Sequence, residues 1–186
     1  MAEHENSVGQ SDDWFTPREY FDALGLVFDL DPCSPGRRHW VPARKVYTKR
    51  DDGLAQPWRG LVFMNPPFGD RHGHVPWLVK FLDHGNGIAI VRAYTSSDWW
   101  HDRVAPRAQA ILFPRGKTQF IRGNRMRSVS RKGIVTIHAA GTTGKSPGHG
   151  VALIAMGGAA VAALARCGLG HFLDNRPAIA RLRKAG

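Results

Sequence analysis

The sequence predicts an α/β fold in which a mostly parallel sheet carries an antiparallel edge. Between residues 26 and 113, short apolar runs that fit buried strands alternate with stretches that fit helices, which is typical of parallel sheets. After residue 114 the pattern changes to strand-like pieces separated by basic or glycine-rich loops, and this predicts hairpins. The 186 residues suffice for one domain with a proper core. We therefore expect a disordered tail at 1–12 and a single domain at 13–186.

The first elements have recognisable ends. Thr16 fits a helix N-cap, Pro17 fits the first helical position, and Gly25 fits the residue that ends the helix. A short apolar strand at 26–30 then leads into the turn that begins at Asp31. The polar and basic stretch that follows, as far as residue 58, shows no convincing periodicity, so no element is expected in it.

The later elements follow from apolar runs, cap residues and turn residues. We expect strands at residues 61–64, 87–91, 108–113, 118–121, 134–139 and 150–156. We expect helices at residues 75–83, 98–104, 159–166 and 177–184. Because Trp99 and Trp100 are adjacent, at most one of them is expected to face the core.

The most informative motif of the chain, Asn65-Pro66-Pro67-Phe68, follows directly on the apolar strand at residues 61–64. Two consecutive prolines must end that strand, since proline has a fixed φ and no N–H for the ladder. Asn65 then lies at the carboxyl end of a strand, where open α/β sheets bind their ligands. An amide oxygen, free proline carbonyls and an aromatic face suit a planar ring that bears an exocyclic amino group. The alternative is a strand-ending turn whose Phe68 packs into the core.

The formal net charge of +11 is unevenly distributed. Residues 1–31 hold eight acids and one base, so the rest of the chain carries +18. Residues 103–132 contain nine bases and no acid. A solvated basic face is the simple interpretation of such a run, but its length favours a polyanion, and above all nucleic acid, as partner.

Several classes of protein are excluded by the composition. The first thirteen residues are acidic and polar, unlike a secretory signal, and the longest apolar stretch, 151–165, is too short for a membrane span. Cys33 and Cys167 make neither a disulfide framework nor a zinc site, so we expect a cytoplasmic protein. His72, His74 and His84 raise the alternative of a metal-dependent nuclease. Their spacing matches no metal-ligand pattern, so we expect solvated loop histidines and no metal.

Several motifs in order resemble the phage-type DNA N-6-adenine methyltransferases. These motifs are Trp14-Phe15-Thr16-Pro17, Phe28-Asp29-Leu30-Asp31-Pro32-Cys33, Asp52-Gly53-Leu54-Ala55 with Trp58, Val62-Phe63-Met64-Asn65-Pro66-Pro67-Phe68, Arg92-Ala93-Tyr94-Thr95-Ser96-Ser97 before Trp99-Trp100, and Gly116-Lys117-Thr118-Gln119-Phe120. The resemblance covers roughly residues 13–156, and its most specific part is the Asn-Pro-Pro-Phe motif. It implies a bacterial or phage enzyme with a Rossmann-like fold that transfers a methyl group from S-adenosylmethionine to adenine N6.

The resemblance also implies a set of site residues. The catalytic residues would be Asn65, Pro66, Pro67 and Phe68. The residues that border S-adenosylmethionine would be Phe15, Thr16, Pro17, Asp31, Pro32, Cys33 and Asp52. Asp31 would meet a cationic amino group or ribose hydroxyls, and Asp52, or Asp51 beside it, would contact the ribose or the adenine. The glycine-rich cofactor loop of many methyltransferases is absent, and the short region before Asn65 predicts a reduced sheet.

The basic region supplies the expected nucleic-acid contacts. A hairpin or loop within residues 114–150 would straddle the backbone of double-stranded DNA from which a base has been flipped out. The expected contact residues are Arg115, Lys117, Arg122, Arg125, Arg127, Arg131 and Lys132. Two alternatives stay open: a methyltransferase that acts on RNA or on a protein glutamine, and a nucleic-acid-binding module without catalysis. The sequence does not indicate the oligomeric state.

Overall fold

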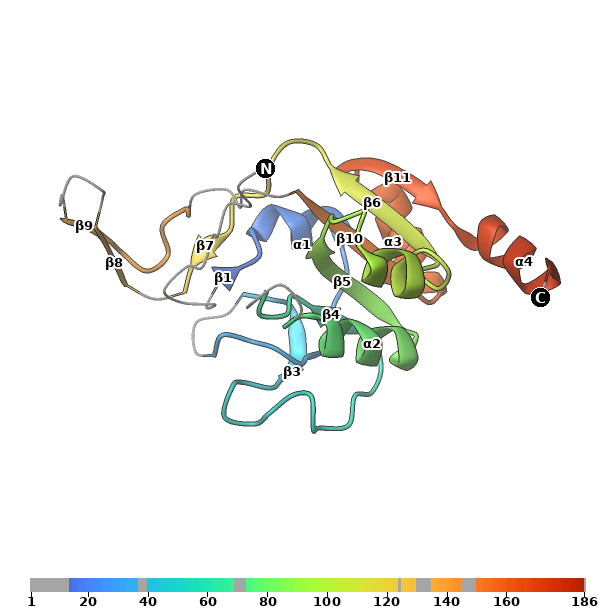
Figure 1. The fold of residues 1–186 in the computed structure, drawn as a ribbon. Helices are drawn as coiled ribbons and strands as arrows, with labels where there is room; N and C mark the ends of the chain where they lie inside the picture. Colours follow the sequence, from blue (N-terminus) through green and yellow to red (C-terminus); the bar gives the residue numbers. More distant parts are fainter. Residues whose placement is uncertain are drawn as a thin grey trace.

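A seven-stranded mixed sheet forms the centre of the molecule in the computed structural model, which describes residues 14–36, 40–68, 73–123, 125–129, 135–144 and 150–185 (Figure 1). Its strands are β2 (Phe28–Asp31), β3 (Ala43–Val46), β4 (Val62–Met64), β5 (Gly87–Arg92), β6 (Ala110–Pro114), β10 (Val151–Met156) and β11 (Gly170–Asp174). The helices are α1 (Arg18–Leu24), α2 (Val75–His84), η1 (Trp100–Val104), α3 (Gly158–Arg166) and α4 (Arg176–Ala185). The expected tail at 1–12 lies outside the described residues. No helix in the described part of the chain is long and apolar enough to cross a membrane.

The strand order is β11-β6-β10-β5-β4-β2-β3. Strands β3, β2, β4 and β5 run parallel, whereas β10, β6 and β11 continue the sheet in antiparallel pairings. The predicted α/β class, with a parallel and an antiparallel part, is confirmed. The antiparallel part is three strands wide because β10 enters the sheet between β5 and β6.

Two edge strands were not predicted. Strand β3 lies in the stretch that we expected to leave the sheet reduced, and its residues Arg44 and Lys45 are exposed. Strand β11 pairs with β6 on one side and exposes Leu173. Edge strands that expose one side to solvent need no continuous apolar run, and an apolar run is the signal by which the buried strands were found.

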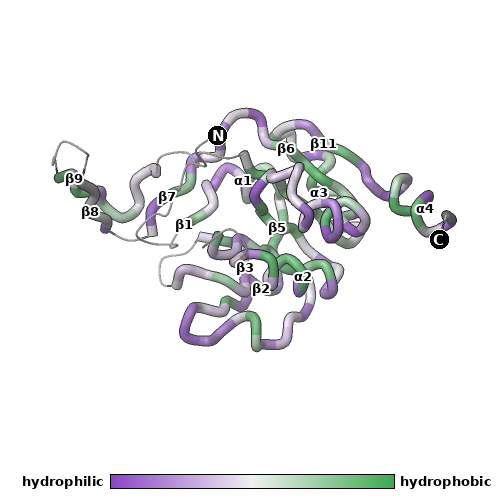
Figure 2. The backbone as a smooth tube through the Cα atoms, in the orientation of Figure 1, coloured by the Kyte–Doolittle hydropathy of each residue, from purple (hydrophilic) through white to green (hydrophobic). Residues whose placement is uncertain are grey.

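The core lies on both faces of the sheet. On one face, α1 and α3 pack over a cluster that contains Phe21, Phe63 and Leu153. On the other face, α2 and η1 pack over Met64, Val91 and their neighbours. Strands β5 and β10 are buried along their whole length, and Figure 2 shows hydrophobic residues along the central strands. A doubly covered sheet therefore supports the residues at its strand ends.

The start of the first helix differs from the prediction. Helix α1 begins at Arg18 with Pro17 as its N-cap, and no side chain caps it. Pro17 has φ −55° and ψ 143°, an extended conformation that places Thr16 before the helix rather than over its first turn. The Thr16 side chain is buried instead. Gly25 ends α1 in the left-handed conformation, as predicted.

The two adjacent tryptophans are both buried, so the expectation that at most one faces the core is wrong. The Trp99 ring lies 4.7 Å from the His74 ring, and the Trp100 ring stacks at 6.3 Å on Phe113. The predicted helix at 98–104 is a single π-helical turn, η1. Because the two rings pack against different elements, each finds its own covered position.

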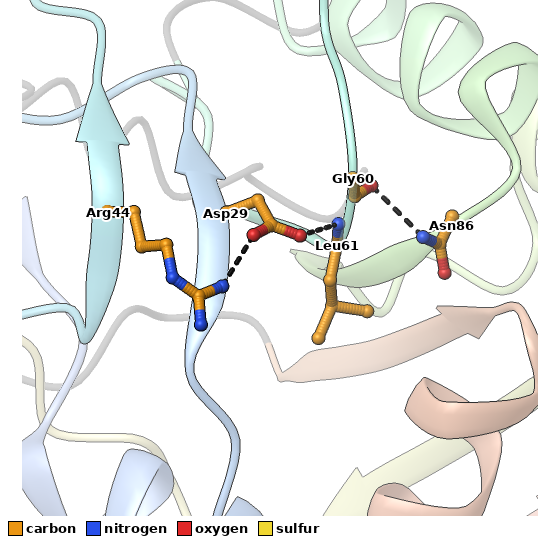
Figure 3. A network of polar contacts seen from close by, with 5 residues as sticks. All are labelled: Asp29, Arg44, Gly60, Leu61 and Asn86. Carbon is orange, nitrogen blue, oxygen red and sulfur yellow. Dashed lines mark hydrogen bonds and ion pairs between the residues drawn. The ribbon is translucent and has the colours of Figure 1, made fainter.

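A polar network ties the amino ends of the parallel strands together (Figure 3). The Asp29 carboxylate accepts hydrogen bonds from the Leu61 amide at 2.8 Å and from Arg44 at 2.6 Å. These two bonds lower the pKa of Asp29. The Asn86 side chain donates to the Gly60 carbonyl at 3.0 Å. The network lies at the ends of β4 and β5 opposite to those that carry Asn65.

Two small sheets complete the fold. Strand β1 (Trp14–Phe15) pairs antiparallel with β7 (Ile121–Arg122), and β8 (Met126–Val129) pairs antiparallel with β9 (Val135–His138). The β8–β9 ribbon extends away from the central sheet (Figure 1). It falls within the region 114–150 that was expected to form a basic hairpin.

Candidate active site

Three parallel strands end at the same edge of the sheet with polar residues. Asp31 is the last residue of β2, Asn65 follows β4, and Arg92 is the last residue of β5. The register pairs Leu30 with Val62 and Met64 with Ala89, so these ends are neighbours. This is the carboxyl edge, where α/β sheets bind ligands.

A small pocket that opens to solvent lies at this edge. It is lined by Trp14, Phe15, Thr16, Asp31, Cys33, Pro35, Val41, Phe63 and Asn65. Five of these residues were expected at the site, and they come from three separate stretches of chain. The fold therefore brings the β1 segment, the turn after β2 and the end of β4 around one cavity.

The Asn65 side chain is held in one orientation. Its Nδ2 donates a hydrogen bond to the Trp14 carbonyl oxygen at 3.2 Å, across 51 residues of sequence. This bond makes Oδ1 the acceptor end of the amide. The backbone amide of Asn65 also contacts the Cys33 thiol, whose pKa is raised well above its usual value, chiefly by burial. Among the described residues, no hydrogen bond occupies the adjacent Pro66 carbonyl.

The ring of Phe68 is half-buried and surrounded by other rings. It lies 6.2 Å from Phe120 at 89° and 6.4 Å from His74 at 78°. The guanidinium carbon of Arg92 lies 5.2 Å from the centre of the Phe68 ring. Phe68 therefore packs at the margin of the core cluster that contains Phe120, beside Arg92 at the end of β5.

Asp31 is a buried carboxyl at the pocket wall. Burial raises its pKa to about 7, although hydrogen bonds from the Cys33 amide and the Ser34 side chain oppose this shift. Beside it, the Thr16 hydroxyl is buried and has no hydrogen-bond partner in the part of the chain that the structure describes. The Thr16 carbonyl accepts a bond from Trp40 at 2.8 Å. A buried acid and an unpartnered hydroxyl, set among aromatic rings, fit a ligand that carries an amino cation or sugar hydroxyls.

Asp52 is not among the residues that line this pocket. It is exposed, with φ 50°. Its neighbour Gly53 packs so closely on the Asp31-Pro32 turn that a Cβ there would lie 1.9 Å from the Pro32 carbonyl oxygen. Asp51 accepts bonds from the Thr48 amide and hydroxyl, both at 2.7 Å, so its carboxylate already closes a local turn. Of the two acids, Asp52 is the one whose carboxylate makes no hydrogen bond to another described residue.

The remaining expected residues have varied surroundings. Pro17, Pro32 and Pro66 are buried and shape the turns at the site, and Pro67 is half-buried. Arg115, Lys117 and Arg125 are exposed. The backbone of Arg127 lies in β8, whereas Arg131 and Lys132 lie outside the described residues.

Arg122 differs from the other basic residues because its side chain is buried. Its Nη1 donates to the Thr142 hydroxyl at 3.2 Å and to the Thr143 carbonyl, and its guanidinium lies over the Trp14 ring. The guanidinium thus fastens the loop at 141–144 to the β1–β7 pair. This placement argues against a direct contact between Arg122 and a phosphate.

The histidines also differ from the prediction. His74 is fully buried rather than solvated, and its ring makes edge contacts with the rings of Phe68 and Trp99. His84 Nε2 bonds the Gly60 carbonyl at 2.8 Å, and His72 lies outside the described residues. No cluster of metal-ligating side chains occurs among the described residues. Nothing in the local sequence distinguishes His74 from a loop histidine, because its neighbours come from distant elements.

A family model for DNA N-6-adenine-methyltransferase (Dam) matches residues 4–139, more than two thirds of the chain. The match includes the strand ends at Asp31 and Asn65 and the whole pocket lining. Neither the curated proteins nor the solved structures include a match to this chain. The chain therefore belongs to the DNA N-6-adenine-methyltransferase (Dam) family, whose members transfer a methyl group from S-adenosylmethionine to adenine N6.

Proposed function

We propose that the carboxyl edge of β2 and β4 holds a flipped-out adenine of double-stranded DNA next to S-adenosylmethionine. The observation that carries this proposal is the anchored amide of Asn65. Its Nδ2 is held by the Trp14 carbonyl, and its Oδ1 is left as an acceptor at the wall of the pocket.

At the substrate end, Asn65 Oδ1 and the Pro66 carbonyl oxygen accept hydrogen bonds from the two N–H groups of the adenine amino group. The lone pair of this nitrogen is delocalised into the ring, so the amine is a poor nucleophile. Two acceptors that hold the nitrogen in a more tetrahedral state turn the lone pair out of the ring. Phe68 stacks on the base and keeps its plane fixed. Positioning and electrostatics then supply most of the acceleration.

At the cofactor end, the pocket offers Asp31 to an amino cation or ribose hydroxyls and the Thr16 hydroxyl to a further polar group. Phe15 and Cys33 also line this pocket, and Pro17, Pro32 and the exposed Asp52 would complete the cofactor site around it. S-adenosylmethionine, when bound, supplies the electrophilic methyl group. Asn65 belongs to both ends, because it lines the cofactor pocket and its Oδ1 accepts the hydrogen bond from the substrate.

DNA binding would use the exposed bases. Arg115, Lys117 and Arg125 are free of ion pairs with other described residues and are available to phosphates. Contacts to phosphates position a duplex, and they lose strength steeply as salt rises. Extrusion of the base costs a few kcal/mol, which stacking on Phe68 partly offsets.

The test compares Asn65→Ala with Asn86→Ala, a second asparagine whose side chain bonds a carbonyl at the opposite ends of the strands. Each protein is incubated with tritiated S-adenosylmethionine and duplex DNA, RNA or a protein extract, and the labelled product is digested and identified. We expect N6-methyladenine from DNA with the wild type and Asn86→Ala. Asn65→Ala should lose activity by at least about two orders of magnitude, as oxyanion-hole variants do, and still bind S-adenosylhomocysteine. Near-normal turnover by Asn65→Ala would overturn the proposal.

A further inference from the structure

Two residues at the end of β5 have no part in the mechanism above. Arg92 is the last residue of the strand, and Tyr94 follows two positions later. In the parallel pairing of β4 with β5, Met64 lies opposite Ala89. Three residues beyond this pair, the first strand leads to Pro67 and the second to Arg92. The end of β5 therefore lies beside the Asn-Pro-Pro-Phe turn.

The guanidinium of Arg92 contacts two aromatic rings. Its central carbon lies 5.2 Å from the centre of Phe68 and 5.7 Å from the centre of Tyr94. The Arg92 side chain is 8% exposed, so this contact is enclosed by protein. A guanidinium is planar and delocalised, and it stacks on aromatic faces much as a nucleobase does. The Arg92 guanidinium is thus a planar group with N–H donors that lies against the rings of Phe68 and Tyr94.

Tyr94 is fixed in place but open to solvent. It is 36% exposed and belongs to the few large exposed hydrophobic side chains among the described residues. Its carbonyl accepts bonds from the Ser97 hydroxyl at 2.6 Å and the Ser97 amide at 3.0 Å, which fix the backbone of the turn. Because the backbone that carries this ring is fixed, little backbone entropy is lost when a base stacks on the ring.

We propose that Tyr94 is a second base-stacking residue, and that the target adenine takes the place of the Arg92 guanidinium against Phe68 and Tyr94. This inference rests on the proposed function. A planar ring at that place contacts both aromatic rings and also lies beside Asn65, which follows the neighbouring strand. The guanidinium then moves toward the rim, where the phosphates of the flipped nucleotide offer it an anion. Phe68 and Tyr94 together would hold the plane of the base, whereas Asn65 holds its amino group.

The first measurement is the steady-state methylation of unmethylated duplex DNA by the wild type, Tyr94→Ala, Tyr94→Phe and the control Leu173→Ala. Leu173 is a similarly exposed apolar residue on the edge strand β11. We expect Tyr94→Ala to raise the KM for DNA about tenfold, since base–aromatic stacking contributes on the order of that factor. Tyr94→Phe should stay within about twofold of the wild type because the ring is kept. Equal thermal midpoints of all four proteins would show that folding is unaffected.

The second measurement places 2-aminopurine at the adenine that the wild-type enzyme methylates. Stacking quenches this fluorophore, so Tyr94→Ala should bind with a brighter signal than the wild type and Tyr94→Phe should not. If the wild type methylates DNA but Tyr94→Ala has unchanged KM and fluorescence, the role of Tyr94 is refuted and the proposed function stands. If the wild type methylates no adenine in DNA, both are refuted. If Tyr94→Phe fails as badly as Tyr94→Ala, the hydroxyl matters rather than the stacked ring, and the inference is also overturned.

Discussion

Replacement of Asp31 by asparagine should stabilise the protein without ligand while it weakens the cofactor site. Burial raises the pKa of Asp31 to about 7 from its ordinary value of 3.8. The folded state therefore binds this proton more tightly than the unfolded state, and the free energy of unfolding falls as the pH rises from about 4 to about 7. The difference of about three pH units corresponds to at most about 4 kcal/mol at pH 8. Asp31→Asn escapes this cost and can still accept the bond from the Cys33 amide.

Urea unfolding at pH 4.5 and pH 8, without cofactor, measures this effect. Asp31→Asn should be more stable than the wild type at pH 8 by a few kcal/mol and nearly equal to it at pH 4.5. Asp29→Asn, two residues earlier on β2, is the matched control. The Leu61 amide and Arg44 lower the pKa of Asp29, so its loss should destabilise the protein at neutral pH and matter less as the pH falls. A wild type that is more stable than Asp31→Asn at pH 8 would refute this account of the buried acid.

Three further outcomes are expected. The affinity for S-adenosylhomocysteine, measured by calorimetry, should rise by up to about tenfold per pH unit from pH 5 to pH 7. The ligand favours the ionised form of Asp31, so binding must release the proton of this carboxyl group. An affinity of the wild type that does not change with pH would contradict this. DNA affinity, measured by fluorescence anisotropy, should fall steeply as the salt concentration rises. The double variant Arg115→Ala/Lys117→Ala should reduce the slope of the logarithm of the association constant against the logarithm of the salt concentration by about 2. An unchanged slope would exclude these residues from the phosphate contacts. Gly53→Ala should destabilise the protein by several kcal/mol in urea unfolding, because its Cβ would lie 1.9 Å from a backbone oxygen. The control Gly158→Ala, which has open space in α3, should stabilise the protein by about 0.5–1 kcal/mol. Equal effects of the two variants would mean that the turn beside Asp31 can shift to accommodate the added Cβ.

Much of the fold followed from local signals. The apolar runs located β4, β5, β6 and β10, since strands buried on both faces must be apolar throughout. The strands β3 and β11 escaped prediction because edge strands lack such a run. Thr16 was predicted both as a helix N-cap and as a residue of the cofactor site. It lines the pocket, and the extended conformation at Pro17 excludes the role of helix cap.

The local sequence was enough to predict methyl transfer to an amino group and the strand ends that carry Asp31 and Asn65. Asn65-Pro66-Pro67-Phe68 is a contiguous motif whose stiffness is a covalent property of proline, so it needs no tertiary contact to be recognised. Asp31 was likewise predicted from its place at the end of a strand, and it lines the pocket. The orientation and the partners of these groups could not be predicted from local sequence. The Trp14 carbonyl that holds Asn65, the loop that turns Arg122 inward, and the rings around Arg92 all come from distant segments, and such partners meet only when the chain packs.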